Sequence, residues 1–277
     1  MENKRREILK FENVSLRYHT KDGETLALKD VNFSVYEQEF VAIVGPSGCG
    51  KTTLLSLIAG ILKPSEGKIY LDGKDISLYK NKALQGENAS LGYMFQKDQL
   101  FEWRNIWKNV TLGVELKKKK KDTQLLSRVE NLLNKYGLGS FKKSKPSELS
   151  GGMRQRVALI RTLALNPTLL LLDEPFSALD FQTRLNVCDN VSKIISNEKK
   201  TAILVTHDIS EAVSLADRVI VLSSRPGTVK KIVEINLKEF GTPLERRESK
   251  KAHEYFDEIW NELVIHKNKG DSNEKNN

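Results

Sequence analysis

One stretch of the sequence reads Phe40-Val41-Ala42-Ile43-Val44-Gly45-Pro46-Ser47-Gly48-Cys49-Gly50-Lys51-Thr52-Thr53. An apolar run of five residues precedes a glycine-rich loop, and the apolar helical pattern of residues 54–58 follows it. A strand, a loop and a helix in this order form the P-loop, in which glycines let backbone N–H groups surround phosphate oxygens. The stretch therefore predicts a phosphate-binding site with residues 45–53 as its loop.

The residue types in this loop suit an anionic ligand. The helix N-terminus adds partial positive charge, the Lys51 ammonium would reach the β and γ phosphates, and the Thr52 hydroxyl would ligate Mg²⁺. A glycine turn without a ligand is the structural alternative, but the preceding strand and the following helix favour the phosphate site.

A second motif places two acids at the end of an apolar run. Residues 169–172 are four leucines, and Asp173 and Glu174 follow them. Open α/β sheets present ligand-binding groups at the carboxyl ends of their strands. Asp173 would hold Mg²⁺, usually through water, and Glu174 would orient or deprotonate a water that attacks a phosphate. The alternative is a pair of acids that merely solvates a strand end.

Short apolar runs recur along the chain with helical patterns between them, at residues 40–44, 169–172, 202–205 and 219–222. Continuous apolar character indicates strands that are covered on both faces, as in a mostly parallel open sheet. Residues 8–36 instead alternate and contain a turn at residues 21–23, which is typical of antiparallel strands. The predicted fold class is α/β, a P-loop NTPase (RecA-like) with a mixed sheet core, an antiparallel β subdomain and an inserted helical subdomain.

The helical subdomain is expected at about residues 97–165, where leucines and valines recur every three to four positions before Gly137. The main domain then covers residues 1–235. A short helical extension is expected at 236–266, where aromatic and aliphatic residues form an amphipathic pattern, and residues 267–277 form a polar tail that we expect to be disordered.

Composition excludes several classes of protein. The 277 residues include 45 lysines and arginines against 36 aspartates and glutamates, which gives a net charge of +9. Two cysteines are too few for a disulfide scaffold, and the charged N-terminus lacks the apolar segment of a signal peptide. We therefore expect a cytoplasmic globular protein that reaches a membrane only through a partner.

The octapeptide Leu149-Ser150-Gly151-Gly152-Met153-Arg154-Gln155-Arg156 resembles the signature motif of ABC-transporter ATPase subunits. Further segments, in the same order as in that family, extend the resemblance over about residues 8–235. They are Tyr18, which resembles the aromatic residue that stacks on adenine, Gln96 of the Q-loop, Ser177-Ala178-Leu179-Asp180 of the D-loop, and His207 of the switch region.

The resemblance implies ATP as the nucleotide, with Mg²⁺ as its metal. It implies that Gln96 contacts the metal or the attacking water and relays the nucleotide state to a membrane partner, and that His207 contacts the γ phosphate. Taken singly, each residue has a simpler explanation, since a tyrosine on a strand often only packs and a glutamine is an ordinary loop amide. His207 follows a buried strand, which favours the family role.

By resemblance, Ser150 and the Gly151-Gly152 backbone bind the γ phosphate held by a second subunit, and Asp180 joins the two sites. One P-loop and one signature in the chain imply a homodimer, or a dimer with a related subunit. Phe101 and Trp103 follow the Q-loop, where they would either anchor a transmembrane permease or pack the core of the helical insert.

Residues 149–165 and 216–227 are similar to the importers of nitrate, sulfonates, taurine and thiamine precursors. Gln38 departs from the glycine usual in the family, and residues 236–250 lack a Pro-Arg-rich segment. The resemblance implies ATP-driven import through a separate permease at the cytoplasmic face of the membrane, with an extracellular or periplasmic substrate-binding protein. An exporter ATPase and a soluble non-transport ABC ATPase are the alternatives. We read Lys117–Lys121 as a solvated loop and expect no nucleic acid.

Overall fold

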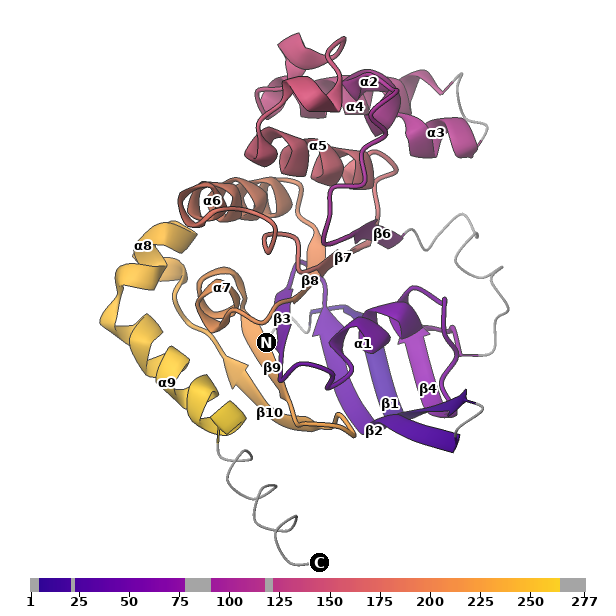
Figure 1. Ribbon diagram of the computed structural model, residues 1–277, viewed down its shortest axis with the longest axis vertical. Helices are drawn as coiled ribbons and strands as arrows, with labels where there is room; N and C mark the ends of the chain where they lie inside the picture. The colour runs from indigo at the N-terminus through magenta and orange to yellow at the C-terminus, as the bar shows by residue number, and fades with distance from the viewer. Residues whose placement is uncertain (1–4, 21–22, 78–90, 118–121, 265–277) are drawn as a thin grey trace, which may run out of the picture. The chain divides into compact units, whose positions relative to one another are not determined.

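The computed structural model describes residues 5–20, 23–77, 91–117 and 122–264. Contacts within the chain are concentrated in two compact units. Unit 1 consists of residues 1–89 together with residues 201–277, and unit 2 consists of residues 90–200. Both units contain strands and helices (Figure 1).

Unit 1 contains an antiparallel sheet with the strand order β2-β1-β4-β5. Its strands are β1 (Glu7–Thr20), β2 (Gly23–Tyr36), β4 (Glu66–Leu71) and β5 (Lys74–Asp75). The rings of Phe11 and Phe33, which are register partners on β1 and β2, stack with their centroids 4.6 Å apart. The alternating pattern of residues 8–36 therefore forms the expected antiparallel pair.

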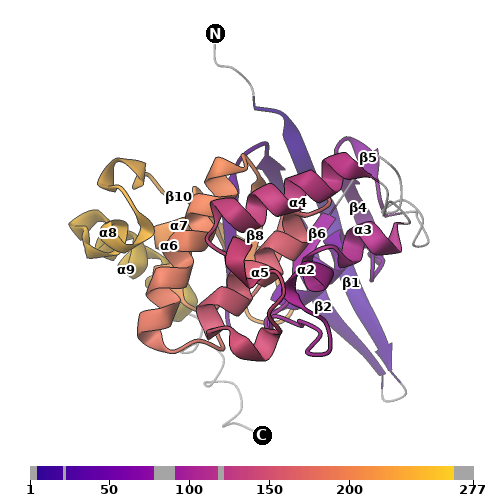
Figure 2. The ribbon, with the colours of Figure 1, turned by 90° about the horizontal axis from the view of Figure 1, so that it is seen from above.

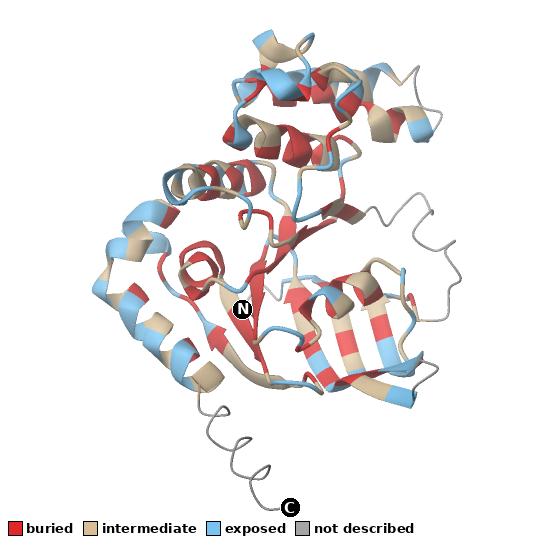
Figure 3. Ribbon diagram, viewed as in Figure 1, coloured by how far each residue is buried: buried red, intermediate tan, exposed pale blue. Residues whose placement is uncertain are grey.

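A second group of strands in unit 1 contains three of the four predicted apolar runs, in β3, β8 and β9. The group consists of β3 (Phe40–Val44), β8 (Thr201–Val205), β9 (Arg218–Leu222) and β10 (Val229–Glu234). β3 pairs in parallel with both β8 and β9, and β10 pairs antiparallel with β9. Every residue of β3 and β8 is buried, as Figure 3 shows. The continuous apolar runs therefore form interior strands of a mixed sheet, as predicted.

Helices α1 (Lys51–Ile58) and α7 (Ile209–Leu215) belong to the same unit. Its C-terminal part contains η4 (Lys238–Phe240), α8 (Pro243–Glu248) and α9 (Lys250–Val264). α9 packs against α7, β9 and β10, and it buries Ile259 while Trp260 remains half exposed. Lys231 on β10 forms an ion pair with Glu258 on α9 at 2.9 Å. The amphipathic residues Tyr255 to Leu263 thus lie on α9.

Unit 2 combines one parallel pair of strands with a group of helices. The strands are β6 (Leu91–Met94) and β7 (Leu169–Asp173). The helices are α2 (Ile106–Val110), α3 (Leu112–Leu116), α4 (Thr123–Lys135), η2 (Gly139–Phe141), η3 (Pro146–Glu148), α5 (Gly151–Leu163) and α6 (Phe181–Asn197). α2, α4 and α6 all pack against α5, and Figure 2 gives a view of this group from above.

Local chemistry explains where α4 begins and ends. The Asp122 carboxylate accepts a hydrogen bond from the Leu125 backbone N–H at 3.0 Å, which satisfies one of the unpaired donors of the first turn. The helix buries Val129, Leu132 and Leu133 and ends just before Gly137. The periodic pattern at residues 125–136 is thereby confirmed as a helix.

Gln38 has a left-handed backbone with φ of 59°. Glycine adopts this conformation without strain, whereas a side chain makes it costly. The turn therefore explains why a glycine is usual at this position in the family that the sequence resembles. The Gln38 backbone N–H donates to Thr201 Oγ1 at 2.9 Å, which ties the turn to the start of β8.

Three predictions fall wholly or partly on residues that the structure does not describe. They are the polar tail at 267–277, most of the lysine run, since residues 118–121 lie in a gap, and the turn at 21–23, since residues 21–22 lie in another. Within the described ranges, no helix has the length and apolar character that a membrane span requires.

Candidate nucleotide-binding and hydrolysis site

The P-loop sequence connects β3 to α1 in unit 1, as the strand-loop-helix pattern predicts. Gly50 is the N-cap of α1, and its φ of 105° is one that side chains rarely adopt. A Cβ atom at Gly50 would lie only 2.6 Å from Cδ2 of Leu28. Both the backbone conformation and the tight packing therefore require glycine at the point where the loop becomes a helix.

Lys51 is folded onto its own loop. Its Nζ donates to the carbonyl oxygens of Gly45 at 2.8 Å and Pro46 at 3.0 Å, and the residue is buried. The Tyr18 hydroxyl lies 3.2 Å from Oγ1 of Thr53. Tyr18 is 37% exposed, so part of its side chain remains accessible to solvent beside the start of α1. The structure thus brings Tyr18 and residues 45–53 together.

The segment 223–228 supports the P-loop from outside. Gly227 exchanges hydrogen bonds with β2, donating to the Ala27 carbonyl at 2.9 Å and accepting from the Lys29 N–H at 3.0 Å. A Cβ atom at Gly227 would lie 2.1 Å from the Cys49 carbonyl oxygen. Gly227 therefore lets this segment pack directly against the P-loop backbone.

His207 follows β8 in the same unit. Since β3 and β8 are parallel and Ile43 is in register with Val205, the P-loop and His207 leave the same edge of the sheet. The turn after β8 is fixed by its own hydrogen bonds. The Thr206 hydroxyl donates to the Glu211 carboxylate at 2.7 Å, and the Asp208 side chain caps α7 by accepting from the Glu211 N–H at 3.1 Å.

Gln96, Asp173 and Glu174 lie together in unit 2. β6 and β7 are parallel with Met94 opposite Leu172, so the residues that follow both strands emerge at one edge. The Gln96 amide donates to the Ser177 hydroxyl at 3.0 Å, and its nitrogen lies 3.5 Å from a carboxylate oxygen of Glu174. Ser177 in turn donates to the Glu174 carbonyl at 3.0 Å.

Tyr93, which belongs to none of the sequence motifs above, contacts this group. Its hydroxyl donates to Oδ2 of Asp173 at 3.0 Å. Burial and the neighbouring Asp173 carboxylate raise the pKa of the Tyr93 hydroxyl, so it remains a neutral donor at neutral pH. The only sequence signal was its position three residues before Gln96 in a short apolar run.

The signature residues line a pocket of about 370 Å³ in unit 2. The Ser150 hydroxyl is the N-cap of α5, and the Asp180 carboxylate is the N-cap of α6, where it accepts from the Thr183 N–H at 3.0 Å. Ser150, Gly151, Gly152 and Asp180 all contribute to the wall. Helix N-termini carry partial positive charge and unpaired N–H groups, which suit an anion.

Comparisons with known proteins agree with these features. A family model described as "ABC transporter" matches residues 28–177. The chain belongs to this family. ABC ATPases among its relatives include the uncharacterised ABC transporter ATP-binding protein YtlC of Bacillus subtilis, which is 43% identical over 92% of this chain and 95% of its own length. The taurine import ATP-binding protein TauB of Ruegeria pomeroyi is 42% identical over 89% of each chain.

Solved structures of ABC ATPases support the same assignment. The chain is similar to a dimeric post-hydrolysis state of the ATP-binding cassette MJ0796 bound to ADP and Pi, with a TM-score of 0.69 and 33% identity over 83% of this chain and 99% of that one. The resemblance noted in the sequence is therefore confirmed, as are the fold class, ATP binding and the ATPase class of this protein.

The signature helix of this ABC ATPase is tied to the segment after Gln96. Arg154 on α5 forms an ion pair with the Asp98 carboxylate at 2.8 Å, and Arg161 donates to the Asp98 carbonyl at 2.6 Å. Burial opposes ionisation of Asp98, but hydrogen bonds from Arg154 and from the Leu100 N–H outweigh it and lower its pKa. Asp98, two residues after Gln96, therefore forms one polar cluster with Arg154 and Arg161 of the signature helix.

The two aromatic residues of this segment differ in exposure. The rings of Phe101 and Trp103 stack with centroids 4.8 Å apart, and Trp103 is 76% exposed. The alternative in which Trp103 packs the core of the helical insert is therefore wrong. Its indole lies on the surface of unit 2.

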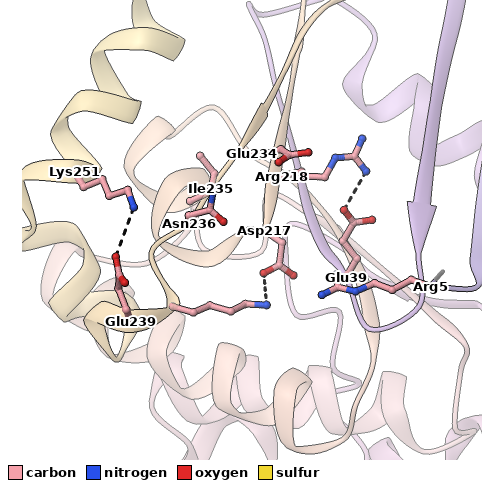
Figure 4. Close-up of a pocket in the computed structure, with 10 residues that line it drawn as sticks. Arg5, Glu39, Asp217, Arg218, Glu234, Ile235, Asn236, Glu239 and Lys251 are labelled. Atoms are coloured by element: carbon pink, nitrogen blue, oxygen red, sulfur yellow. Dashed lines mark hydrogen bonds and ion pairs between the residues drawn. The ribbon is translucent and has the colours of Figure 1, made fainter. Parts of the chain in front are cut away.

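A cavity of about 520 Å³ in unit 1 lies between the ends of β9 and β10, η4 and the start of α9 (Figure 4). Its walls carry paired charges. Glu39 pairs with Arg218 at 3.0 Å and Glu239 with Lys251 at 3.6 Å, while Lys238 pairs with Asp217. Among the described residues that line it, none is a predicted nucleotide-site residue of this ABC ATPase.

Proposed function

We propose that this ABC ATPase drives uptake of a small solute through a separate membrane permease. The observation that supports import is the similarity of this chain to proteins that are named import ATP-binding proteins. These include TauB at 42% identity and the aliphatic sulfonates import ATP-binding protein SsuB of Bacillus anthracis at 39% identity over 81% of this chain. The expected solutes are of the nitrate, sulfonate, taurine or thiamine-precursor type.

In this proposal the P-loop binds the phosphates of ATP. Backbone N–H groups of residues 45–53 donate to phosphate oxygens, and Lys51 exchanges the carbonyls of Gly45 and Pro46 for the β and γ phosphates. The Tyr18 ring stacks on adenine, and its hydroxyl contact with Thr53 orients it beside the loop. Exposure of the Tyr18 ring supports this role.

The oxygen groups of Thr52, Gln96 and Asp173 are of the type that Mg²⁺ prefers. Among the described residues, no three His, Cys, Asp or Glu side chains cluster as a metal site, which fits a metal held by one carboxylate and the nucleotide phosphates. When bound, Mg²⁺ neutralises charge on the β and γ phosphates.

Hydrolysis requires a base for the attacking water. The Glu174 carboxylate takes a proton from that water, the water oxygen forms a bond to the γ phosphorus, and the bridging P–O bond to the β phosphate breaks. Gln96, which lies within 3.5 Å of Glu174, positions the same water. His207 contacts the γ phosphate from the edge where the P-loop emerges, a position consistent with the parallel register of β3 and β8.

Two copies act together in this mechanism. The pocket at Ser150, Gly151 and Gly152 has the N-terminus of α5 in its wall and binds the γ phosphate carried by the second copy, while Asp180 links the two sites. The dimeric state of the similar cassette MJ0796 supports this arrangement. The partner is a second copy of this chain or a related ATPase subunit.

The membrane partners follow from the import proposal. We propose that the protein lies at the cytoplasmic face of the membrane, that Trp103 contributes to the surface for the permease, and that a substrate-binding protein completes the complex. Trp103 is highly exposed in this chain, so its indole is available to become buried against a partner. Aromatic side chains that become buried in this way are common anchors of protein interfaces, which supports the permease contact.

Affinity purification of the tagged chain from detergent-solubilised membranes tests the proposal, with mass spectrometry of the co-eluting proteins. Recovery of a permease with a substrate-binding protein is expected. A permease that exports when reconstituted with ATP would instead indicate an exporter. Recovery of ribosomal or DNA-bound proteins without any permease would contradict transport altogether.

A further inference from the structure

The register of β6 and β7 places Tyr93 on the same side of the strand pair as Asp173. Tyr93 is opposite Leu171, and Leu171 and Asp173 point to the same face because side chains alternate along a strand. A phenol is long enough to reach one side-chain position further along the neighbouring strand. The Tyr93 hydroxyl accordingly donates to Oδ2 of Asp173 at 3.0 Å.

The ring that carries this hydroxyl is held in place. Tyr93 is partly buried, and its ring packs against Phe95 with centroids 4.5 Å apart. Phe95 lies between Tyr93 and Gln96 in the sequence, so the segment that carries the donor also leads into the Q-loop. The donor is therefore fixed by the backbone of β6 and by an aromatic contact.

The hydrogen bond from Tyr93 constrains the orientation of the Asp173 carboxylate. Rotation about the last side-chain bond of an aspartate is broad, so its oxygens are not aimed by rotamer preference alone. A hydrogen bond to one oxygen fixes that rotation. Outer-shell hydrogen bonds of this kind orient metal-binding carboxylates in many proteins.

We propose that Tyr93 is a positioning residue that holds the Asp173 carboxylate in the orientation needed to bind Mg²⁺ with ATP. The inference rests on the proposed role of Asp173 as a metal-binding residue. It assigns to Tyr93 a role in metal affinity, whereas the ring alone would contribute only to packing.

Tyr93→Phe tests this, because the substitution removes the hydroxyl and keeps the ring. The readout is the free Mg²⁺ concentration that half-saturates binding of a fluorescent, non-hydrolysable ATP analogue to the full chain, followed by fluorescence. We expect that concentration to rise about 10-fold, the lower end of the range for loss of an outer-shell partner. ATPase activity should recover when Mg²⁺ is raised, which a packing defect would not allow.

Tyr136→Phe is the matched control. The Tyr136 hydroxyl also donates to a carboxylate, that of Glu198 at 2.9 Å, and it lies in the same unit. This variant should leave the Mg²⁺ requirement unchanged. A double variant gives a second control: on an Asp173→Asn background, Tyr93→Phe should add no further loss, because the residue acts through the aspartate.

The outcomes distinguish the inference about Tyr93 from the proposed metal-binding role of Asp173. An unchanged or lower Mg²⁺ requirement in Tyr93→Phe would overturn the inference, as would an equal rise in Tyr136→Phe or an additive loss in the double variant. If the wild-type chain bound the analogue without any dependence on Mg²⁺, the proposed metal role of Asp173 would fail, and the inference with it.

Discussion

Gly227 offers a direct test of how the P-loop is held. In Gly227→Ala, the added Cβ atom would lie 2.1 Å from the Cys49 carbonyl oxygen, and real Cβ contacts are essentially never shorter than 3.0 Å. The two backbones must therefore separate by about 0.9 Å. Two backbone hydrogen bonds hold Gly227 to β2. The hydroxyl of Thr228 also donates a hydrogen bond to the hydroxyl of Ser223 at 3.0 Å, which stabilises the same segment. We expect the P-loop to take up much of the movement.

The magnitude follows from the hydrogen bonds that the loop would make to phosphate. A hydrogen bond to a charged group contributes about 1.5–3 kcal/mol, and each 1.4 kcal/mol is a factor of about 10 in affinity. Loss of one such bond gives a roughly 10- to 100-fold increase in the Kd for ATP. Overpacking should also lower the free energy of unfolding by about 1–3 kcal/mol.

Titration of a fluorescent ATP analogue and thermal unfolding of Gly227→Ala measure both effects. Ser224→Ala is the control, because Ser224 is an exposed neighbour in the same segment and should change neither quantity. Wild-type affinity and stability in Gly227→Ala would refute the reasoning, since the close approach of Gly227 to Cys49 would then have no energetic consequence.

Three further predictions concern other parts of the chain. Glu174→Gln removes the proposed base and should trap an ATP-bound dimer, visible by gel filtration with Mg²⁺ and ATP; a variant that stays monomeric contradicts this. Asp98→Asn should lower the free energy of unfolding by about 1 kcal/mol at pH 7. Burial opposes ionisation of Asp98, but the hydrogen bonds from Arg154 and the Leu100 N–H lower its folded pKa. The stabilisation by the ionised carboxylate is therefore complete above about pH 4 and is lost as the pH falls through that folded pKa. Urea unfolding of both proteins at pH 7 and at a pH below the folded pKa of Asp98 checks this, and an equal loss of stability at the two pH values would exclude the ion pair as its cause. Gln38→Gly should raise the free energy of unfolding by up to about 1 kcal/mol by relieving the left-handed backbone, and a loss in the same assay would show that the greater entropy of the unfolded chain dominates.

Most of what could be predicted from the sequence followed from local patterns of apolar residues and glycines. The P-loop, the buried strands and α4 depend on residues that are close in the sequence, so their periodicity and glycine positions were enough. The common edge of β3 and β8 was also accessible, because parallel strands place their carboxyl ends together.

Contacts between distant segments could not be predicted in this way. The hydrogen bond from Tyr93 to Asp173 spans 80 positions and depends on the register of β6 against β7, which no local pattern determines. The ion pair between Arg154 and Asp98 spans 56 positions. The exposure of Trp103 was left open because an aromatic residue in a helical insert serves equally well in a core or on a surface.

Glu174 combines a proposed catalytic carboxylate with a left-handed backbone, at φ of 44°. A non-glycine residue in this region stores about 1–2 kcal/mol of conformational strain. A substitution to glycine at this position would release that strain while it removes the proposed base. Selection for heat resistance alone would therefore favour loss of this carboxylate, so a thermal screen of variants at position 174 would select for stability at the expense of the proposed base.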